Sequence, residues 1–190
     1  MPLSLTNLSN IEHPGYVSGR YYQGFRDASA DTSSTAAFTI NFITYYLFTV
    51  YHQITLTRLG IYVAGSVSGA NVRLRIYSNQ NGIPLNLLAD GGNIIAASPG
   101  AKEAIISLPL TPGNYWLGGT TTVAPSLYSA ISFLGTNHDL GQSAPSSVLA
   151  TCGQRNTIAV SPDALGSEAP TDNLQLITGN IRPFFWFKVA

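Results

Sequence analysis

Charge is scarce in this sequence. Nine basic and nine acidic residues among 190 make 9% charged and a formal net charge of zero, whereas an average soluble domain is about 25% charged. A protein that neutralises phosphates needs an excess of Lys and Arg, so we expect no nucleic-acid partner. Because 45% of the residues are hydrophobic and 11% aromatic, the chain is not of the disordered class either. We expect a folded domain with an uncharged polar surface.

Cysteine and histidine are equally scarce. Cys152 is the single cysteine, so no internal disulfide can form, and His13, His52 and His138 lie far apart in the sequence. Neither residue type shows the close spacing at which two ligands meet one ion, so the sequence predicts no metal site and no cofactor. We expect Cys152 to be a small buried residue. His52 lies in an apolar run, which favours a core or interface histidine over a catalytic base.

Long apolar runs are missing too. Residues 42–51 form the longest one, which Thr44 and Thr49 interrupt, and it is about half the length of a membrane-spanning helix. The N-terminus shows no basic region followed by an apolar stretch, so we expect no signal peptide and no membrane insertion. A protein made in a cytoplasm, including a virion component released by lysis, fits these features.

No catalytic motif is recognisable. Residues 65–69 resemble a Gly-x-Ser-x-Gly nucleophile elbow, but Val67 stands where the serine would be. A glycosidase needs only two carboxylates, and a sheet could bring Asp27 beside Asp31 or Asp90 beside Glu103. Nine acids make some such pair almost inevitable, so we expect no enzyme activity and no catalytic residues. Asp90 is expected to cap the backbone of a polar turn.

The pattern that is abundant is that of β-strands. Apolar residues alternate with polar ones over residues 38–42 and 72–77, a period of two. Further strands are predicted at residues 54–63, 105–110, 114–117, 128–134 and 184–189, the last apolar on both faces as in a central strand. Residues 79–82 and 111–113 are typical of turns. The sequence therefore predicts an all-β fold, an antiparallel, jelly-roll-like β-sandwich.

Two regions carry weaker patterns. Pro84 can open at most about one helical turn over residues 85–88, and no window keeps a helical period for three turns. Residues 135–179 are rich in Ser, Pro, Asn and Gly, so we expect long loops there, with one strand near residues 157–160.

The first 26 residues differ from the rest because aromatic side chains occur there without a sustained period. We predict residues 1–26 as an arm that docks on its own domain or on a neighbour, and residues 27–190 as a single sandwich domain. Arg73 and Arg75 share one face of their predicted strand with Tyr77, and this face is either solvated or in contact with a carboxylate of a neighbouring subunit. The candidate assembly residues are Tyr16, Arg20, Tyr21, Tyr22, Arg73 and Arg75.

Several segments, in order along the chain, together resemble small virion surface proteins of tailed bacteriophages. They are residues 18–22 (SGRYY), 58–63 (RLGIYV), 71–77 (NVRLRIY), 87–90 (LLAD), 110–117 (LTPGNYWL) and 181–185 (IRPFF). The sequence departs from that pattern at Arg75, where glycine is more usual, and at Gly118 and Gly119, where bulkier residues are usual. The resemblance implies a β-sandwich module with a structural or adhesive role, virion localisation and other virion proteins as partners.

Three functions stay open at this point. The leading one is a tail-fibre or baseplate-attached module, a homo-oligomer with a trimer favoured, that attaches to a host-surface glycan. Loops 123–128 and 137–147 contain residues suited to glycan binding. The alternative is a capsid decoration protein that bridges capsomers. The third is a carbohydrate-binding module or a glycan-degrading enzyme.

Overall fold

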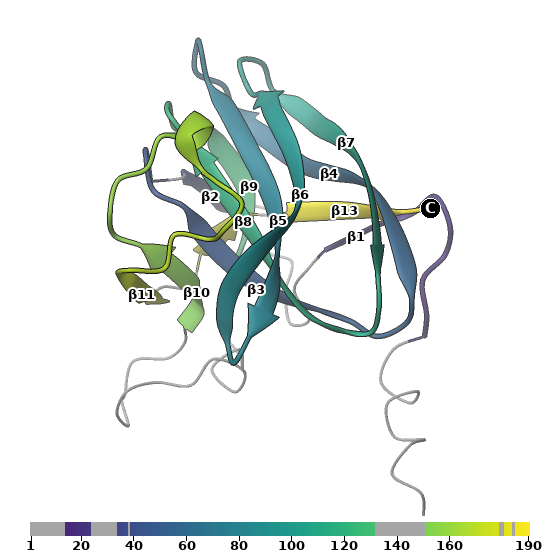
Figure 1. Ribbon diagram of the computed structural model, residues 1–190. Coiled ribbons are helices and arrows are strands. Elements are labelled where there is room, and N and C mark those ends of the chain that lie inside the picture. The colour runs from purple at the N-terminus through teal and green to yellow at the C-terminus, as the bar shows by residue number, and fades with distance from the viewer. Residues whose placement is uncertain (1–13, 24–33, 38, 132–150, 179–180, 184) are drawn as a thin grey trace, which may run out of the picture.

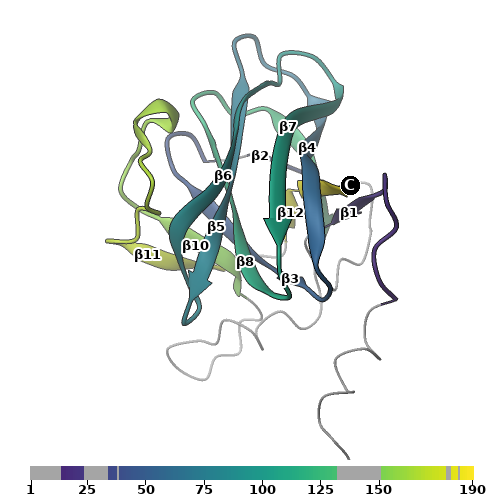
Figure 2. The same ribbon diagram turned by 45° about the vertical axis from the view of Figure 1, so that its right-hand side comes forward.

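The computed structural model describes residues 14–23, 34–37, 39–131, 151–178, 181–183 and 185–190. Within these ranges the regular structure is β, apart from one turn of 3₁₀ helix at Pro162–Ala164. Two antiparallel sheets pack against each other (Figures 1 and 2). The predicted all-β antiparallel sandwich is therefore confirmed, while the jelly-roll connectivity stays a prediction.

The two sheets contain seven and six strands. The seven-stranded sheet has the order β1 (Tyr21–Gln23), β13 (Phe185–Val189), β4 (Ile54–Gly65), β9 (Ser126–Ile131) and β12 (Ile181–Pro183), with β2 (Ser34–Ala37) paired to β9 and β7 (Gly100–Leu110) paired to β4. The six-stranded sheet has the order β11 (Leu174–Thr178), β10 (Thr151–Asn156), β3 (Thr44–Val50), β8 (Gly113–Thr121), β5 (Asn71–Gln80) and β6 (Ile83–Ile95). As predicted, the C-terminal apolar strand is central, because β13 lies between β1 and β4.

The main core lies between the sheets and follows the two-residue period of the strands. Leu59, Ile61 and Val63 enter it from β4, and Leu74 and Ile76 enter it from β5. All five side chains are at most 2% exposed, and burying each one contributes about 1.5–3 kcal/mol. The alternation predicted for residues 72–77 is confirmed on this inner face, and the strand predicted at residues 54–63 is confirmed as part of β4.

Residues 157–173, which we call the strap, cover the outer face of the six-stranded sheet (yellow-green in Figure 1). The Val160 N–H donates to the Asn41 carbonyl near the start of β3, and the Ala169 N–H donates to the Leu85 carbonyl on β6, both at 2.7 Å. A second apolar cluster forms beneath the strap; its buried members are Ile43, Tyr45, Tyr77, Trp116 and Ala169. Both faces of this sheet are therefore buried where the strap crosses it.

The two predicted turns are confirmed as hairpins. Asn81 and Gly82 join β5 to β6 with φ values of 52° and 80°. Positive φ at both central residues matches the twist of antiparallel strands, and Asn-Gly tolerates it best. Residues 111–112 connect β7 to β8. The turn that Pro112 and Gly113 predict is therefore at the expected place.

Three other local predictions are wrong. Of the strand predicted at residues 38–42, the described part, residues 39–42, is irregular, because a turn with φ 60° at Asn41 precedes β3. Residues 85–88 belong to β6 and not to a helical turn, since β6 is an edge strand and an edge strand tolerates Pro84. Residues 157–160 are irregular and begin the strap, and the strand of this region lies just before them, in β10.

Candidate functional site

The described part of the N-terminal segment docks on the chain's own sandwich. The Tyr22 ring stacks on Phe187 with 6.1 Å between centroids, and Tyr16 meets Tyr22 edge to face at 5.0 Å. The Arg20 carbonyl accepts a hydrogen bond from the Val189 N–H at 3.1 Å. Tyr16 and Tyr22 thus complete an edge of the main core. A role of Tyr16, Arg20 and Tyr22 in assembly stays a prediction.

Tyr21 has a different position, on the outer face of the seven-stranded sheet, which carries a groove of about 220 Å³. Alternation along β1 explains the difference, because neighbouring side chains of a strand point to opposite faces. The groove is lined by side chains and backbone of β1, β4, β7 and β13. Its main lining residues are Tyr21, Gly60, Tyr62, Ala101, Glu103 and Trp186.

Strand register creates the groove. Gly60 pairs with Trp186 on one side and with Glu103 on the other, so these three residues form one row across the sheet. A side chain is missing at the centre of this row, so the backbone of β4 lies bare between Trp186 and Glu103. The Tyr21 hydroxyl reaches across from β1 and donates to Glu103 Oε1 at 2.5 Å. Tyr21 therefore closes one side of the groove.

Cations support this arrangement from the next row of the sheet, where Tyr21, Lys188 and Arg58 are neighbours. Arg58 Nε lies 3.5 Å from Glu103 Oε2, and the Lys188 ammonium lies 5.2 Å from the centre of the Tyr21 ring. Both contacts hold the Tyr21–Glu103 pair in place. The hydrogen bond to Glu103 raises the pKa of Tyr21, with a smaller contribution from burial, so Tyr21 is a proton donor at neutral pH.

This groove is chemically suited to a ring with one apolar face and a hydroxylated edge. Tyr and Trp combine a flat apolar body with a polar tip, and Glu103 offers carboxylate acceptors. The aromatic surface continues onto β9, where Tyr128 meets Tyr62 edge to face at 5.2 Å. Of the two predicted glycan loops, residues 123–128 contact the groove residue Tyr62 through Tyr128 without lining the groove, while residues 137–147 lie outside the described residues.

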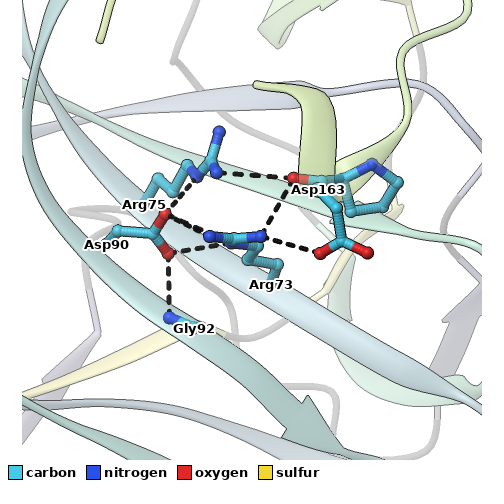
Figure 3. Close-up of polar contacts among 6 residues, drawn as sticks. Arg73, Arg75, Asp90, Gly92 and Asp163 are labelled. Atoms are coloured by element: carbon cyan, nitrogen blue, oxygen red, sulfur yellow. Dashed lines mark hydrogen bonds and ion pairs between the residues drawn. The ribbon is translucent and has the colours of Figure 1, made fainter. Parts of the chain in front are cut away.

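Arg73 and Arg75 form a separate site on the outer face of the six-stranded sheet (Figure 3). Arg73 Nη2 lies 2.8 Å from Asp90 Oδ2, and Arg75 Nε lies 2.9 Å from the same oxygen. Arg73 Nη1 also contacts the Asp163 carboxylate at 2.9 Å and donates to the Pro162 carbonyl at 3.2 Å. The cluster therefore fastens the strap to β5 and β6.

The expectation of a solvated face for the two arginines is wrong. The strap covers that face, so the Arg75 side chain is 2% exposed and Tyr77 is fully buried. The alternative prediction is a carboxylate of a neighbouring subunit, whereas the carboxylate that the two arginines contact belongs to the same chain, at Asp90 on the neighbouring strand. A further contact of Arg73 or Arg75 with another subunit stays a prediction.

Asp90 is the centre of this cluster. Burial alone would raise the pKa of its carboxyl, but hydrogen bonds from Arg73 and from the Gly92 N–H, together with the charges of Arg75 and Arg73, outweigh burial and lower the pKa below its ordinary value. The Gly92 N–H donates to Asp90 Oδ1 at 2.8 Å, so the predicted backbone cap is present. Asp90 caps a bulge within β6, however, and not a separate turn.

The remaining chemical candidates do not converge. Asp90 and Glu103 lie on different sheets and bind different cations, so the structure does not form this carboxylate pair. Asp27, Asp31 and the Cys152 side chain lie outside the described residues. His52 lies in the turn between β3 and β4, not in a strand, and its ring is 6.4 Å from that of Tyr16.

Two further features are absent from the described residues. Among them, no three His, Cys, Asp or Glu side chains gather closely enough to hold a metal ion. No helix in the same part of the chain is long and apolar enough to cross a membrane.

Comparison with known proteins adds no relative, since no protein-family model and no curated protein sequence matches this chain. The resemblance to phage virion proteins therefore stays a prediction. The sequence alone predicts no site at Gly60 or Trp186, and it suggests Glu103 only as half of a carboxylate pair. A glycine inside a strand rich in β-branched residues can mark the close approach of another group. Gly60 is therefore the sequence feature that points to this groove.

Proposed function

We propose that the protein is a non-enzymatic surface component of a bacteriophage virion, a tail-fibre or baseplate-attached module that binds a host-surface saccharide. The observation that carries this proposal is the groove around Gly60, with Trp186 and Tyr62 as its aromatic walls and Glu103 as its polar end. Its volume of about 220 Å³ is below the roughly 300–1,000 Å³ typical of pockets that enclose a drug-sized ligand. It suits one sugar ring of a longer chain that continues into solvent.

Replacement of Trp186 tests the proposal. Trp186→Ala removes the largest apolar wall, so we expect binding of labelled host cells or purified lipopolysaccharide to weaken about tenfold or more, a change of about 1.4 kcal/mol per factor of ten. Ile105→Ala is the matched control, because Ile105 is 77% exposed on the same face of β7 but does not line the groove. Wild-type binding by a folded Trp186→Ala protein would contradict the proposal.

We also propose that the module acts as a homo-oligomer, with a trimer favoured. A single shallow groove gives weak binding, and linking several copies raises the overall affinity by about 10²–10⁴ without any new contact. Light scattering is expected to give a mass of about three chains of 20.2 kDa. A monomer mass at micromolar concentration would remove this part of the proposal.

The position on the particle separates the two virion functions. Labelled antibody and electron microscopy are expected to place the protein on the tail. Label over the head in many copies would instead favour the capsid decoration function.

A further inference from the structure

The short strand β1 contributes to both faces of its sheet. It pairs with β13 in an antiparallel register that places Tyr22 opposite Phe187 (Figure 1). Neighbouring side chains of a strand point to opposite faces. Tyr21 therefore lines the groove on the outer face, whereas Tyr22 packs against the main core on the inner face. The position of the Tyr21 wall thus depends on how Tyr22 is held.

Aromatic contacts anchor β1 on the inner face. The Tyr22 ring stacks on Phe187 with 6.1 Å between centroids, and Tyr16 meets its edge at 5.0 Å. The Tyr22 hydroxyl accepts a hydrogen bond from the Val17 N–H at 2.6 Å. Tyr22 is therefore the centre of the contacts that hold β1 on the sandwich.

Backbone hydrogen bonds complete the attachment of residues 14–23, which we call the docked segment. The Gly19 N–H donates to the Val189 carbonyl at 2.9 Å, and the Val189 N–H donates to the Arg20 carbonyl at 3.1 Å. In the described sheet, β1 is a three-residue strand at one end of the strand order. We therefore expect the docked segment to open locally at a lower free energy than the whole domain unfolds.

Opening of the docked segment would dismantle one side of the groove. Tyr21 would leave with β1, and with it the hydroxyl that donates to Glu103 Oε1 at 2.5 Å. The other lining residues belong to β4, β7 and β13 and would stay in place. The docked form therefore offers a ligand a wall that the open form lacks.

From this geometry we infer that saccharide binding in the groove is coupled to docking of residues 14–23, and that Tyr22 is a positioning residue for the binding site. A ligand that contacts Tyr21 binds the docked form more tightly, so it shifts the equilibrium toward that form. The effect is reciprocal, and a change that opens the segment weakens saccharide binding. This inference rests on the proposed saccharide-binding function.

Substitutions at Tyr22 test the coupling, because Tyr22 does not line the groove. Tyr22→Ala removes the stacked ring, so we expect binding of purified lipopolysaccharide to weaken about fivefold or more. Tyr22→Phe keeps the ring and should bind within about twofold of the wild type. Ile94→Ala is the control for lost stability, since Ile94 is buried in the main core on β6 and away from the groove. It should bind like the wild type.

Hydrogen exchange measures the reciprocal effect. The amides of Gly19 and Val189 are hydrogen-bonded between the docked segment and β13, so their exchange reports opening of the segment. Saturating lipopolysaccharide is expected to slow the exchange of both amides about fivefold or more in the wild type. The Trp186→Ala protein, which we expect to bind this ligand weakly, should show little slowing at the same concentration.

The outcomes separate the inference from the proposed function. If Trp186→Ala loses lipopolysaccharide but a folded Tyr22→Ala protein binds it like the wild type, saccharide binding stands and the coupling is overturned. Unchanged exchange at Gly19 and Val189 with lipopolysaccharide bound would also overturn the coupling. If the wild type binds neither lipopolysaccharide nor host cells, the saccharide-binding function fails, and the inference fails with it.

Discussion

Asp90→Asn is expected to destabilise the protein by about 3–5 kcal/mol, the usual cost of removing one partner from a buried ion pair. The substitution leaves Arg73 and Arg75 without their shared counter-charge, and the Arg75 side chain is 2% exposed. Water therefore cannot replace the lost carboxylate around Arg75. For a domain of this size the loss corresponds to a fall in Tm of roughly 6–20 °C, measurable by calorimetry.

Asp163→Asn is the matched control. It removes a carboxylate from the same cluster, but the Asp163 side chain is 75% exposed, and an exposed pair contributes only about 0–1 kcal/mol. Equal effects of the two substitutions, or a loss below about 1 kcal/mol for Asp90→Asn, would contradict a central role for Asp90.

Acid titration gives a second measurement on the same pair of proteins. Because the pKa of folded Asp90 lies below its ordinary value of 3.8, the unfolded chain takes up this proton first as the pH falls. The stability that Asp90 contributes is therefore complete well above pH 3.8 and is lost as the pH falls through the lowered pKa. The difference in unfolding free energy between wild type and Asp90→Asn should shrink over that range.

Gly118→Ala is expected to destabilise the protein by about 1–3 kcal/mol, the range for overpacking a core. A Cβ at this position would lie 2.8 Å from Tyr77 Cε2 and 3.1 Å from Ile43 Cδ1. Both neighbours are buried beneath the strap, so neither can move aside freely. Chemical denaturation would measure the loss.

Gly166→Ala is the control for the change from glycine to alanine. Gly166 lies in the strap with no other atom within 4 Å of an added Cβ. We expect its replacement to leave stability unchanged or to raise it slightly, by less than about 1 kcal/mol, because alanine restricts the unfolded chain. A loss at Gly166 as large as that at Gly118 would show that overpacking is not the cause.

Strand periodicity predicted much of the sandwich, because a two-residue period depends only on local sequence. It placed the inner face of β5 correctly. The strap could not be predicted in this way, since residues 157–173 have no period and are ordered by contacts with Tyr45, Tyr77 and Trp116, far away in the sequence. The alternation of Arg73 and Arg75 gave the correct side of β5, but it carried no information on what covers that side.

Two departures from the phage-protein pattern prove to be neighbours. Arg75 on β5 pairs directly with Gly118 on β8, so a large side chain lies opposite a position without one. The open space at Gly118 admits the rings of Tyr77 and Tyr45. Each position is unusual in the sequence alone. The register between β5 and β8 is what shows that the two positions are neighbours.

The same holds for the groove. The sequence showed Trp186 within an aromatic run and Gly60 within a strand, 126 positions apart in the chain. Their meeting depends on the pairing of β13 with β4, a long-range choice that neither segment encodes alone. Tyr21 is predicted as an assembly residue of the arm only because it is aromatic, and its partner Glu103 lies 82 residues further along the chain.

The strap also imposes an order on folding. Its fastening joins Arg73 to Asp163, 90 residues apart, and closing such a separation is slow compared with forming a hairpin. The strap packs on side chains of β3, β5 and β8, so we expect these strands to pair before the strap docks. Until the strap docks, the outer face of the six-stranded sheet exposes three large rings to solvent, those of Trp116, Tyr45 and Tyr77. We therefore expect the chain to be most prone to aggregation before the strap docks, and the Arg–Asp cluster to stabilise the docked strap.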